Sequence, residues 1–237
     1  MRQLLHKLPE NAGSVAVGSA VQHRLQRVLR LDAGARVILG DGAGATVEVQ
    51  WNHNVFEAIG PRMLAPQQAP QLHMAVGLIK GERWDWCVEK LAELGVNQLF
   101  PLDLDHCVVR SDPDKSAGKA TKWQQIATDA FEQCGSPFRM HVHEVMSFSQ
   151  WIAAISGAHF AVCDELRPPM PISRYLSAHG DGVVRVIVGP EGGLSISEKQ
   201  QAAAAGGVAV RLGENVLRAE TAAIAAATLV RCVVAQL

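Results

Sequence analysis

The sequence predicts an α/β protein in which a mostly parallel sheet follows a smaller, β-rich segment. After residue 71, apolar runs of strand length alternate with helical patterns, whereas period-two alternation dominates before it. A third observation is the stretch VIVGPEGGLSISE at 186–198, which ends a buried strand in glycines and opens a helix at once. This alternation predicts a parallel sheet with helices on both faces.

The composition indicates a globular chain without a metal. Its 237 residues are 48% hydrophobic and 19% charged, and the net charge of -1 argues against a protein that coats itself in nucleic acid. The five cysteines form no C-x-x-C pair, and His141 and His143 lack a third ligand at metal spacing. No apolar run has membrane-spanning length and MRQLLHKLPE lacks a signal-peptide core, so a cytoplasmic location is expected.

Residues 1–70 are expected to form the β-rich domain. Strands are predicted at 35–39 and 45–51, with Asp41-Gly42 as the turn of a hairpin. The cluster Gly40–Ala45 also matches a G-x-G-x-x-A dinucleotide fingerprint, but that fingerprint requires a helix to follow, and a strand is predicted instead. We interpret the cluster as a hairpin turn, which removes the main support for a nicotinamide enzyme.

A short helix is predicted at 23–30, HRLQRVLR, with three arginines on one face. Arg24, Arg27 and Arg30 are three positions apart, and apolar residues such as Val28 would lie on the opposite face. Such a row could contact RNA phosphates. Taken alone, the segment is better explained as the solvated, charged face of an amphipathic helix than as an RNA contact.

Residues 71–237 are expected to form the α/β domain, after a linker at 58–71 that is bounded by glycine and proline. Buried strands are predicted, in chain order, at 72–79, 96–102, 159–163, 183–188 and 208–212. Helical patterns lie at 84–92, which Gly95 would end, and at 123–131, which Gly135 would end. Ser195 to Glu198 fits a capping box, and 219–234 is apolar all round, as in a helix buried in a core or a dimer interface.

Two glycine-bearing loops follow predicted strands at their carboxyl ends, where open parallel sheets bind ligands. They are Gly189-Pro-Glu-Gly-Gly193 and Leu212–Arg218. The spacing alone supports a cofactor site and a pair of tight turns about equally. Charged residues, among them Arg218 and Glu220, crowd the start of an otherwise apolar helix, and this favours a ligand site.

Five stretches of the chain, in family order, resemble the 16S ribosomal RNA uridine-N3 methyltransferases of the SPOUT superfamily. They are HRLQRVLR (23–30), KGERWDWCVEKLAELGV (80–96), WQQIATDAFEQCGS (123–136), VIVGPEGGLSISE (186–198) and LGENVLRAETA (212–222). The combination of GPEGG with LG-x-x-VLR-x-ETA is specific to the family. The chain departs from the family pattern at Ser136, Glu214, Asn215 and Ala219.

The resemblance implies a PUA-like β-barrel for RNA in residues 1–70 and a SPOUT domain with a trefoil knot in 71–237. It further implies a homodimer that binds S-adenosylmethionine and methylates N3 of a uridine in the 16S rRNA of the small ribosomal subunit. The residues that would surround the cofactor are Gly189, Pro190, Glu191, Gly192, Gly193, Leu212, Gly213 and Leu217. Arg218 and Glu220 would lie beside the reacting methyl group.

The chemistry of such a reaction can be argued from the residues. Methylation of uracil N3 removes a proton that is held at neutral pH, so the site needs a cation for the developing anion and a proton acceptor. The guanidinium of Arg218 suits the uracil oxygens, and Glu220 would accept the proton or orient Arg218. Two alternatives stay open: a related methyltransferase that acts on another RNA, and a non-catalytic RNA-binding protein with the same fold.

Overall fold

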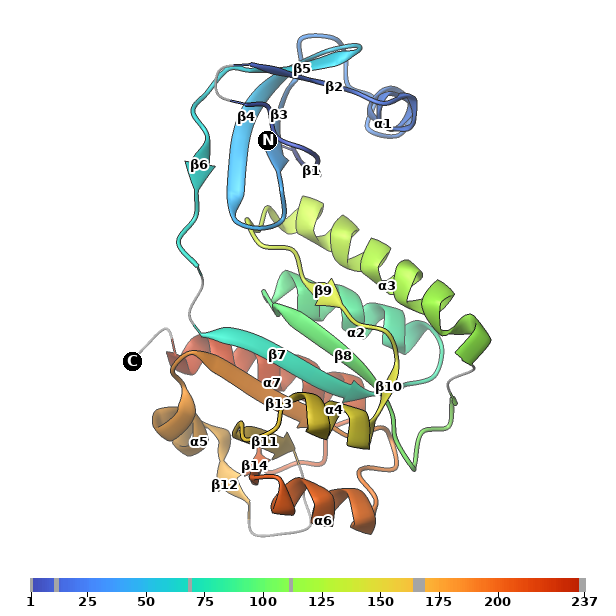
Figure 1. Ribbon diagram of the computed structural model, residues 1–237, viewed down its shortest axis with the longest axis vertical. Coiled ribbons are helices and arrows are strands. Elements are labelled where there is room, and N and C mark those ends of the chain that lie inside the picture. The colour runs from blue at the N-terminus through green and yellow to red at the C-terminus, as the bar shows by residue number, and fades with distance from the viewer. Residues whose placement is uncertain (1, 11–12, 68–69, 111–112, 164–168, 235–237) are drawn as a thin grey trace. The chain divides into compact units, whose positions relative to one another are not determined.

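A computed structural model describes residues 2–10, 13–67, 70–110, 113–163 and 169–234, and the chain divides into two compact units (Figure 1). The first unit comprises Met1–Gln67 together with Phe131–Arg139. The second comprises Gln68–Ala130 and Met140–Leu237. The sequence pattern predicted a boundary near residue 70 and contained no indication that residues 131–139 group with the first unit.

A six-stranded sheet forms the first unit, in the order β1-β3-β4-β5-β2 with β6 paired to β4. Its strands are β1 (Arg2–Leu5), β2 (Ser14–Ala16), β3 (Arg36–Gly40), β4 (Ala45–Asn52), β5 (Val55–Ala58) and β6 (Met63–Leu64). β1 pairs with β3 in parallel, whereas β4 is antiparallel to β3, β5 and β6. Every second residue of β4 is buried, which confirms the strand predicted from period-two alternation.

The turn between β3 and β4 is held by the side chain of Asp41. Its Oδ1 accepts hydrogen bonds from the backbone N–H groups of Ala43, at 2.8 Å, and Ala45, at 3.0 Å. Gly42 has a φ of 73°, which favours glycine. Because β4 follows at once, the glycine cluster is the hairpin turn that the sequence predicted.

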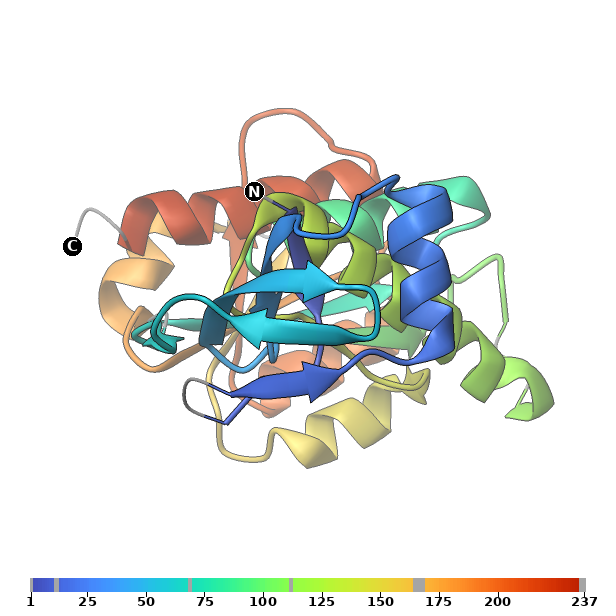
Figure 2. The ribbon, with the colours of Figure 1, turned by 90° about the horizontal axis from the view of Figure 1, so that it is seen from above.

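The arginine-bearing segment folds differently from the predicted amphipathic helix. α1 (Ser19–His23) continues directly into a π-helix, η1 (Arg24–Val28), and the two form one coil (Figure 2). The Leu29 N–H donates to the Arg24 carbonyl at 2.9 Å, five residues back, so the turn is wider than in an α-helix. In this turn Leu25 is fully buried, as expected for the apolar face, but Val28 is 66% exposed. The prediction that Val28 lies on an apolar face is wrong.

Residues 131–139 are an integral part of the first unit. The ring of Phe131 packs so closely over Gly40 that an added Cβ there would lie 3.0 Å from the ring Cζ. The Gly44 N–H donates to the Pro137 carbonyl at 3.0 Å. The sheet of this unit therefore obtains part of its packing and hydrogen bonding from a segment distant in sequence.

An eight-stranded parallel sheet forms the centre of the second unit, in the order β10-β8-β7-β13-β11-β14-β12 with β9 paired to β8. Its strands are β7 (Gln71–Gly77), β8 (Gln98–Asp103), β9 (His141–Val142), β10 (Met146–Ser147), β11 (Phe160–Cys163), β12 (Met170–Pro171), β13 (Val183–Val188) and β14 (Gly207–Arg211). Each strand pair among the described residues is parallel. The predicted α/β class with a parallel sheet is confirmed.

The helices are α2 (Glu82–Glu93), α3 (Pro113–Cys134), α4 (Phe148–Ala154), α5 (Ile172–His179), α6 (Ile196–Ala204) and α7 (Ala219–Val234). The sequence patterns predicted α2, α3, α6 and α7 but not the shorter α4 and α5. The capping box of α6 is present: the Ser195 Oγ accepts from the Glu198 N–H at 3.2 Å, and the Glu198 Oε2 accepts from the Ser195 N–H at 2.7 Å. Within the described ranges no helix is long and apolar enough to cross a bilayer.

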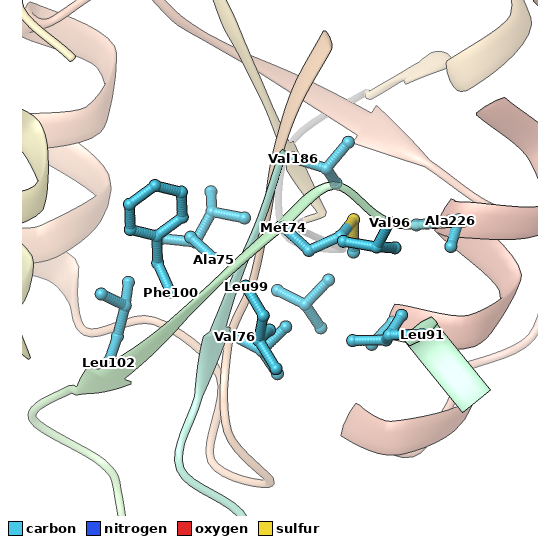
Figure 3. Packing of buried hydrophobic residues seen from close by; sticks show 14 of the residues in the cluster. Met74, Ala75, Val76, Leu91, Val96, Leu99, Phe100, Leu102, Val186 and Ala226 are labelled. Atoms are coloured by element: carbon cyan, nitrogen blue, oxygen red, sulfur yellow. The ribbon is translucent and has the colours of Figure 1, made fainter. Parts of the chain in front are cut away.

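The core of the second unit lies on both faces of its sheet (Figure 3). On one face, Met74 of β7 points toward Leu91 of α2 and Ala226 of α7. Phe100 of β8 points to the opposite face. Trp151 of α4, also in this core, packs edge-on against Phe160 of β11. The apolar strands are thus covered on both sides, which explains their continuous hydrophobic runs.

Histidines gather on the sheet face that carries Phe100. The ring of His143 stacks on Phe100, with 4.0 Å between ring centroids, and its Nε2 lies 2.9 Å from the Gln98 Oε1. Burial lowers the pKa of His143 to about 4. Burial, with the nearby charge of Arg185 as a second cause, lowers the pKa of His73 to about 4 as well. Both rings are therefore neutral in the folded protein at neutral pH.

We expect the protein to lose stability as the pH falls from about 6.5 toward about 4. In this window a histidine of the unfolded chain binds a proton, whereas His73 and His143 of the folded chain do not. Acidification therefore favours the unfolded chain. The free energy of unfolding is unaffected by these groups above about pH 6.5 and falls as the pH drops below it. After allowance for partial exposure, the loss is on the order of 1 to 2 kcal/mol per histidine. Urea unfolding at about pH 7 and about pH 5 measures it. A His73→Gln, His143→Gln double variant should lose less stability on acidification, and an equal loss would contradict the assignment.

Candidate active site

The two glycine-bearing loops meet at one cavity of the second unit, with a volume of about 620 Å³. The loop after β13 forms one part of its wall, and the segment after β14, up to the start of α7, forms another. The cavity lies at the carboxyl ends of the parallel strands, where this architecture places ligands. All the predicted cofactor-binding residues line it: Gly189, Pro190, Glu191, Gly192, Gly193, Leu212, Gly213 and Leu217.

Small residues are required in the first loop because the chain folds tightly on itself. A Cβ at Gly189 would lie 2.9 Å from the carbonyl carbon of Gly193, and a Cβ at Gly77, the last residue of β7, would lie 2.7 Å from the Pro190 Cδ. Gly193 has a φ of 67° and its N–H donates to the Pro190 carbonyl at 2.8 Å. These glycines therefore serve the close packing of the loop, which fixes the direction of its backbone groups.

His106, which follows β8, holds the loop from the other side. Its Nδ1 lies 3.0 Å from the Gly192 carbonyl oxygen and 3.2 Å from that of Gly193. Because carbonyl oxygens only accept, the Nδ1 atom carries the hydrogen in both contacts. A Cβ at Gly192 would lie 2.8 Å from the Cβ of His106. The histidine and the loop are therefore fitted to one another, and His106 also lines the cavity.

The segment around His106 is itself tied to the start of α6. The Ser195 Oγ donates to the Asp105 Oδ2 at 2.6 Å, and the Asp105 N–H donates to the Glu198 Oε1 at 2.9 Å. Glu198, which is only 4% exposed, thus caps its own helix and binds a neighbouring loop. The loops after β8 and β13 form one hydrogen-bonded wall.

The two predicted catalytic residues are placed differently. Arg218 directly precedes α7, is exposed and lines the cavity. Glu220, in the first turn of α7, is 5% exposed and does not belong to the cavity wall. Its Oε1 lies 3.6 Å from the Nη1 of Arg83 in α2, and its Oε2 has no hydrogen-bond partner among the described residues. Within that part of the chain, no hydrogen bond or ion pair joins the side chains of Glu220 and Arg218.

Arg83 also reaches the first loop. Its Nη2 donates to the Glu191 Oε1 at 3.0 Å, so one guanidinium contacts two carboxylates. Cys87, one turn further along α2, has its pKa raised to about 12 by burial, with the Glu220 charge as the second cause. Burial also raises the pKa of Cys163, a cavity residue, to about 12, so its thiol stays protonated at neutral pH. The cavity offers no thiolate nucleophile at Cys163.

Several cavity residues were not identified from the sequence. They are His106, Cys163, Val188, Leu194, Ile196, Lys199, Val210, Arg211, Asn215, Val216, Ala219 and Ala222. The rule that ligands bind at the carboxyl ends of parallel strands could have indicated Cys163, which ends β11, and Val210, near the end of β14. No sequence signal indicated His106, because a single histidine in a loop carries no motif.

The arginines of the predicted RNA-contacting row lie in the first unit and are not equivalent. Arg24 forms a two-point contact with Glu132, with its Nη2 2.6 Å from Oε2 and its Nη1 3.2 Å from Oε1. The Glu132 side chain is only 8% exposed. Arg27 and Arg30 are exposed. The structure therefore gives Arg24 a part in holding this unit together and leaves Arg27 and Arg30 on its surface.

Replacing Arg24 with alanine is expected to lower the free energy of unfolding by about 2 kcal/mol, because the Glu132 carboxylate would stay largely buried without its cation. Arg27→Ala is the matched control and should change stability by less than about 0.5 kcal/mol. Urea unfolding of both variants at neutral pH measures the difference. Equal stability of the two variants would contradict the structural role of Arg24.

Comparison with known proteins identifies relatives along most of the chain. A family model described as an RNA methyltransferase domain matches residues 66–231. The chain is 29% identical to Ribosomal RNA small subunit methyltransferase E of Bacillus subtilis over 90% of this chain and 88% of that one. It is 27% identical to a Synechocystis protein of the same name over 88% of this chain and 70% of that one.

Solved structures share the fold. A methyltransferase from Legionella pneumophila, in complex with the bound cofactor SAM, is 26% identical and superposes with a TM-score of 0.79 over 98% of this chain and 96% of that one. A Neisseria gonorrhoeae structure, a Ribosomal RNA small subunit methyltransferase E bound to S-adenosyl methionine, has a TM-score of 0.87 at 24% identity, over 98% and 97% of the two chains. Both likenesses extend over the two units described above.

Proposed function

Since the chain belongs to the RNA methyltransferase family, we propose that it transfers a methyl group from S-adenosylmethionine to N3 of a specific uridine in the 16S rRNA of the small ribosomal subunit. The matched residues 66–231 include the whole cavity wall. The names of the Bacillus and Synechocystis relatives support a small-subunit ribosomal RNA as the substrate. The observation that carries the proposal is the single cavity formed by the GPEGG and LGENVLR loops.

The cavity residues fit S-adenosylmethionine. The cavity volume of about 620 Å³ is in the range of small-molecule sites. The cavity wall combines apolar side chains with the backbone of two glycine-bearing loops. The Legionella structure holds the same cofactor. We assign its binding to Gly189, Pro190, Glu191, Gly192, Gly193, Leu212, Gly213 and Leu217. When bound, the cofactor supplies a methyl group activated by a sulfonium.

Arg218 is our candidate for stabilising the substrate anion. Loss of the N3 proton leaves negative charge on the uracil ring, shared between N3 and the two carbonyl oxygens. The guanidinium of Arg218 stands at the cavity just before α7, so its donors and the helix N-terminus both favour an anion there. This arrangement would lower the cost of removing the proton before methyl transfer.

Glu220 is our candidate for the proton acceptor, and its contacts suggest a second role. Its Oε2 is buried without a hydrogen-bond partner among the described residues and lies outside the cavity wall, so accepting the substrate proton requires a relay or a movement of the side chain. Its Oε1 is paired with Arg83, which supports a role in shaping the site. An orienting role toward Arg218 has no supporting contact in the described part of the chain.

The remaining features of the proposal concern the fold and the partners. We propose that residues 1–70 act as a PUA-like β-barrel domain that contacts RNA through Arg27 and Arg30, and that 71–237 form a SPOUT domain with a trefoil knot. β11 lies between β13 and β14, whose following loops meet at the cavity, which supports a knotted arrangement. We propose a homodimer in the cytoplasm. Ile196 and Val216, each 78% exposed at the cavity wall, support a protein contact there.

The test is incubation of the purified protein with S-adenosylmethionine and small ribosomal subunits that lack the modification. Digestion of the RNA and mass spectrometry then identify the methylated nucleoside. We expect N3-methyluridine at one position. A different methylated nucleoside, or methylation of another RNA only, would support the alternative of a related methyltransferase. Tight RNA binding without any methylation would support the non-catalytic alternative.

A further inference from the structure

Arg83 is the only described residue that contacts acidic side chains from both the GPEGG loop and the start of α7. It lies in the first turn of α2, on a third chain segment. Its Nη2 is 3.0 Å from the Glu191 Oε1 and its Nη1 is 3.6 Å from the Glu220 Oε1. Arg83 itself does not line the cavity, whereas Glu191 does. Any influence of Arg83 on a ligand in the cavity therefore passes through its two acidic partners.

The two acidic partners of Arg83 are buried to different extents, so loss of the guanidinium would destabilise them by different amounts. The Glu220 side chain is 7% exposed, the Glu191 side chain 29% and the Arg83 side chain 43%. An ionised carboxylate that is largely removed from water requires a cation, and removing that cation costs more than an exposed ion pair contributes. Arg83 is the cation that Glu220 contacts among the described residues. The same guanidinium then donates to the loop that forms the cavity wall.

The surroundings of Glu220 leave it few other ways to be stabilised. Among the described residues its Oε2 has no hydrogen-bond partner. The neighbouring Cys87 thiol stays protonated, because burial and the Glu220 charge raise its pKa to about 12. The indole N–H of Trp84, next to Arg83 in sequence, is also buried and finds no hydrogen-bond partner in the described ranges. The position of the Glu220 carboxylate therefore depends on the guanidinium of Arg83 and on the start of its own helix.

We propose that Arg83 is a positioning residue of the methyltransferase site, which holds Glu191 and Glu220 at fixed places and so keeps the cofactor loop in its binding conformation. The inference rests on the proposed function of the cavity. It assigns to α2 a task in the reaction although α2 contributes no residue to the cavity wall. A guanidinium suits this task because its donors are arranged in a fixed plane and can serve two acceptors at once.

The experiment compares the full-length wild type with Arg83→Met, Arg83→Lys, Glu191→Gln and the Arg83→Met, Glu191→Gln double variant. Lys122→Met is the matched control. Lys122 of α3 forms an exposed ion pair, at 2.5 Å, with Asp85 of α2, the helix that carries Arg83, and neither residue lines the cavity. The dissociation constant for S-adenosylmethionine is measured by calorimetry without RNA. Thermal unfolding of each variant reports stability, and kcat and KM are measured on small ribosomal subunits.

We expect Arg83→Met to weaken cofactor binding about tenfold, or about 1.4 kcal/mol, and Glu191→Gln to do the same. The double variant should bind about as weakly as either single variant, because both changes remove the same interaction. Arg83→Lys should recover only part of the affinity, since it keeps a cation near the carboxylates but lacks the planar donors that serve both of them. Lys122→Met should bind S-adenosylmethionine within about twofold of the wild type, as expected for an exposed ion pair.

Two results would overturn the positioning role. One is Arg83→Met binding S-adenosylmethionine as the wild type does. The other is independent, additive losses in Arg83→Met and Glu191→Gln, which would show that Arg83 does not act through Glu191. If Arg83→Met fails to fold, Arg83→Lys and Glu191→Gln still test the proposal. An unchanged affinity for S-adenosylmethionine in Glu191→Gln would show that Arg83 does not act on cofactor binding through Glu191. Failure of the wild type to bind S-adenosylmethionine would instead contradict the proposed function itself.

Discussion

Valine at position 192 is expected to abolish the binding of S-adenosylmethionine while the chain stays folded. The first carbon of any side chain at this position would lie 2.8 Å from the Cβ of His106, which is closer than non-bonded carbon atoms approach. Valine adds two methyl groups to that conflict. The loop must then move away from His106 and lose the contacts of the Gly192 and Gly193 carbonyls with its ring, at 3.0 and 3.2 Å. Those movements displace the cavity wall.

Calorimetric titration with S-adenosylmethionine measures the effect of Gly192→Val, and we expect the affinity to fall by more than about a hundredfold, or about 3 kcal/mol. The thermal stability should fall by only about 1 to 3 kcal/mol, as in other overpacked sites. Gly213→Ala is the control within the same cavity wall, since an added Cβ there meets no protein atom within 4 Å. It should leave the stability unchanged. Wild-type affinity in a folded Gly192→Val protein would refute the assigned role of the loop.

The second large effect is expected for Arg218→Ala, which should lower kcat by about 100-fold to 1000-fold, the range seen when a group that stabilises a developing anion is removed. Arg218 lines the cavity at the start of α7, and the charge it would stabilise forms only as the N3 proton leaves. The affinity for S-adenosylmethionine should therefore change by less than about threefold, because the cofactor is bound before that charge exists.

Single-turnover methylation of small ribosomal subunits, with saturating cofactor, separates this loss from a binding defect. Arg211→Ala is the matched control, since Arg211 is another exposed arginine of the same cavity wall but lies in β14. Arg218→Lys keeps the charge without the planar fork of donors and should recover only part of the rate. A wild-type rate in Arg218→Ala would show that this residue does not stabilise the anion. An equal loss in Arg211→Ala would show that the total charge of the cavity matters, not the place of Arg218.

The strands and long helices could be predicted because their signals are local. Val183–Val188 is a continuous apolar run and forms β13, and the capping box from Ser195 to Glu198 begins α6 where the sequence indicated. The two-residue strands β9 and β12 have no such signal, because their pairing is defined by the strands beside them. These strands form only because neighbouring strands lie beside them in the folded protein, and the β-propensity of the residues alone does not indicate this.

The candidate site could be predicted only in part, because only those of its features that form a local sequence pattern can be recognised without the fold. The glycine-bearing loops are contiguous motifs, so the sequence placed them at the cavity. The ion pair of Arg83 with Glu191 joins residues 108 positions apart, and no local pattern indicates it. The π-helical turn at Arg24–Val28 likewise depends on how the segment packs, and it leaves Val28 exposed. Contacts of this kind appear only once the fold brings distant segments together.

The participation of residues 131–139 in the first unit limits how this unit could be exchanged between proteins. A fragment that stops at residue 67 would lack Phe131 over Gly40 and the Glu132 carboxylate that binds both Arg24 and the Leu5 N–H. Such a fragment would expose the apolar surface around Gly40 and would lack the carboxylate that binds Arg24. The first unit is therefore encoded by two separate stretches of the gene. Joining or cutting the chain at one position near residue 67 could neither transfer the complete unit to another enzyme nor remove it from this one.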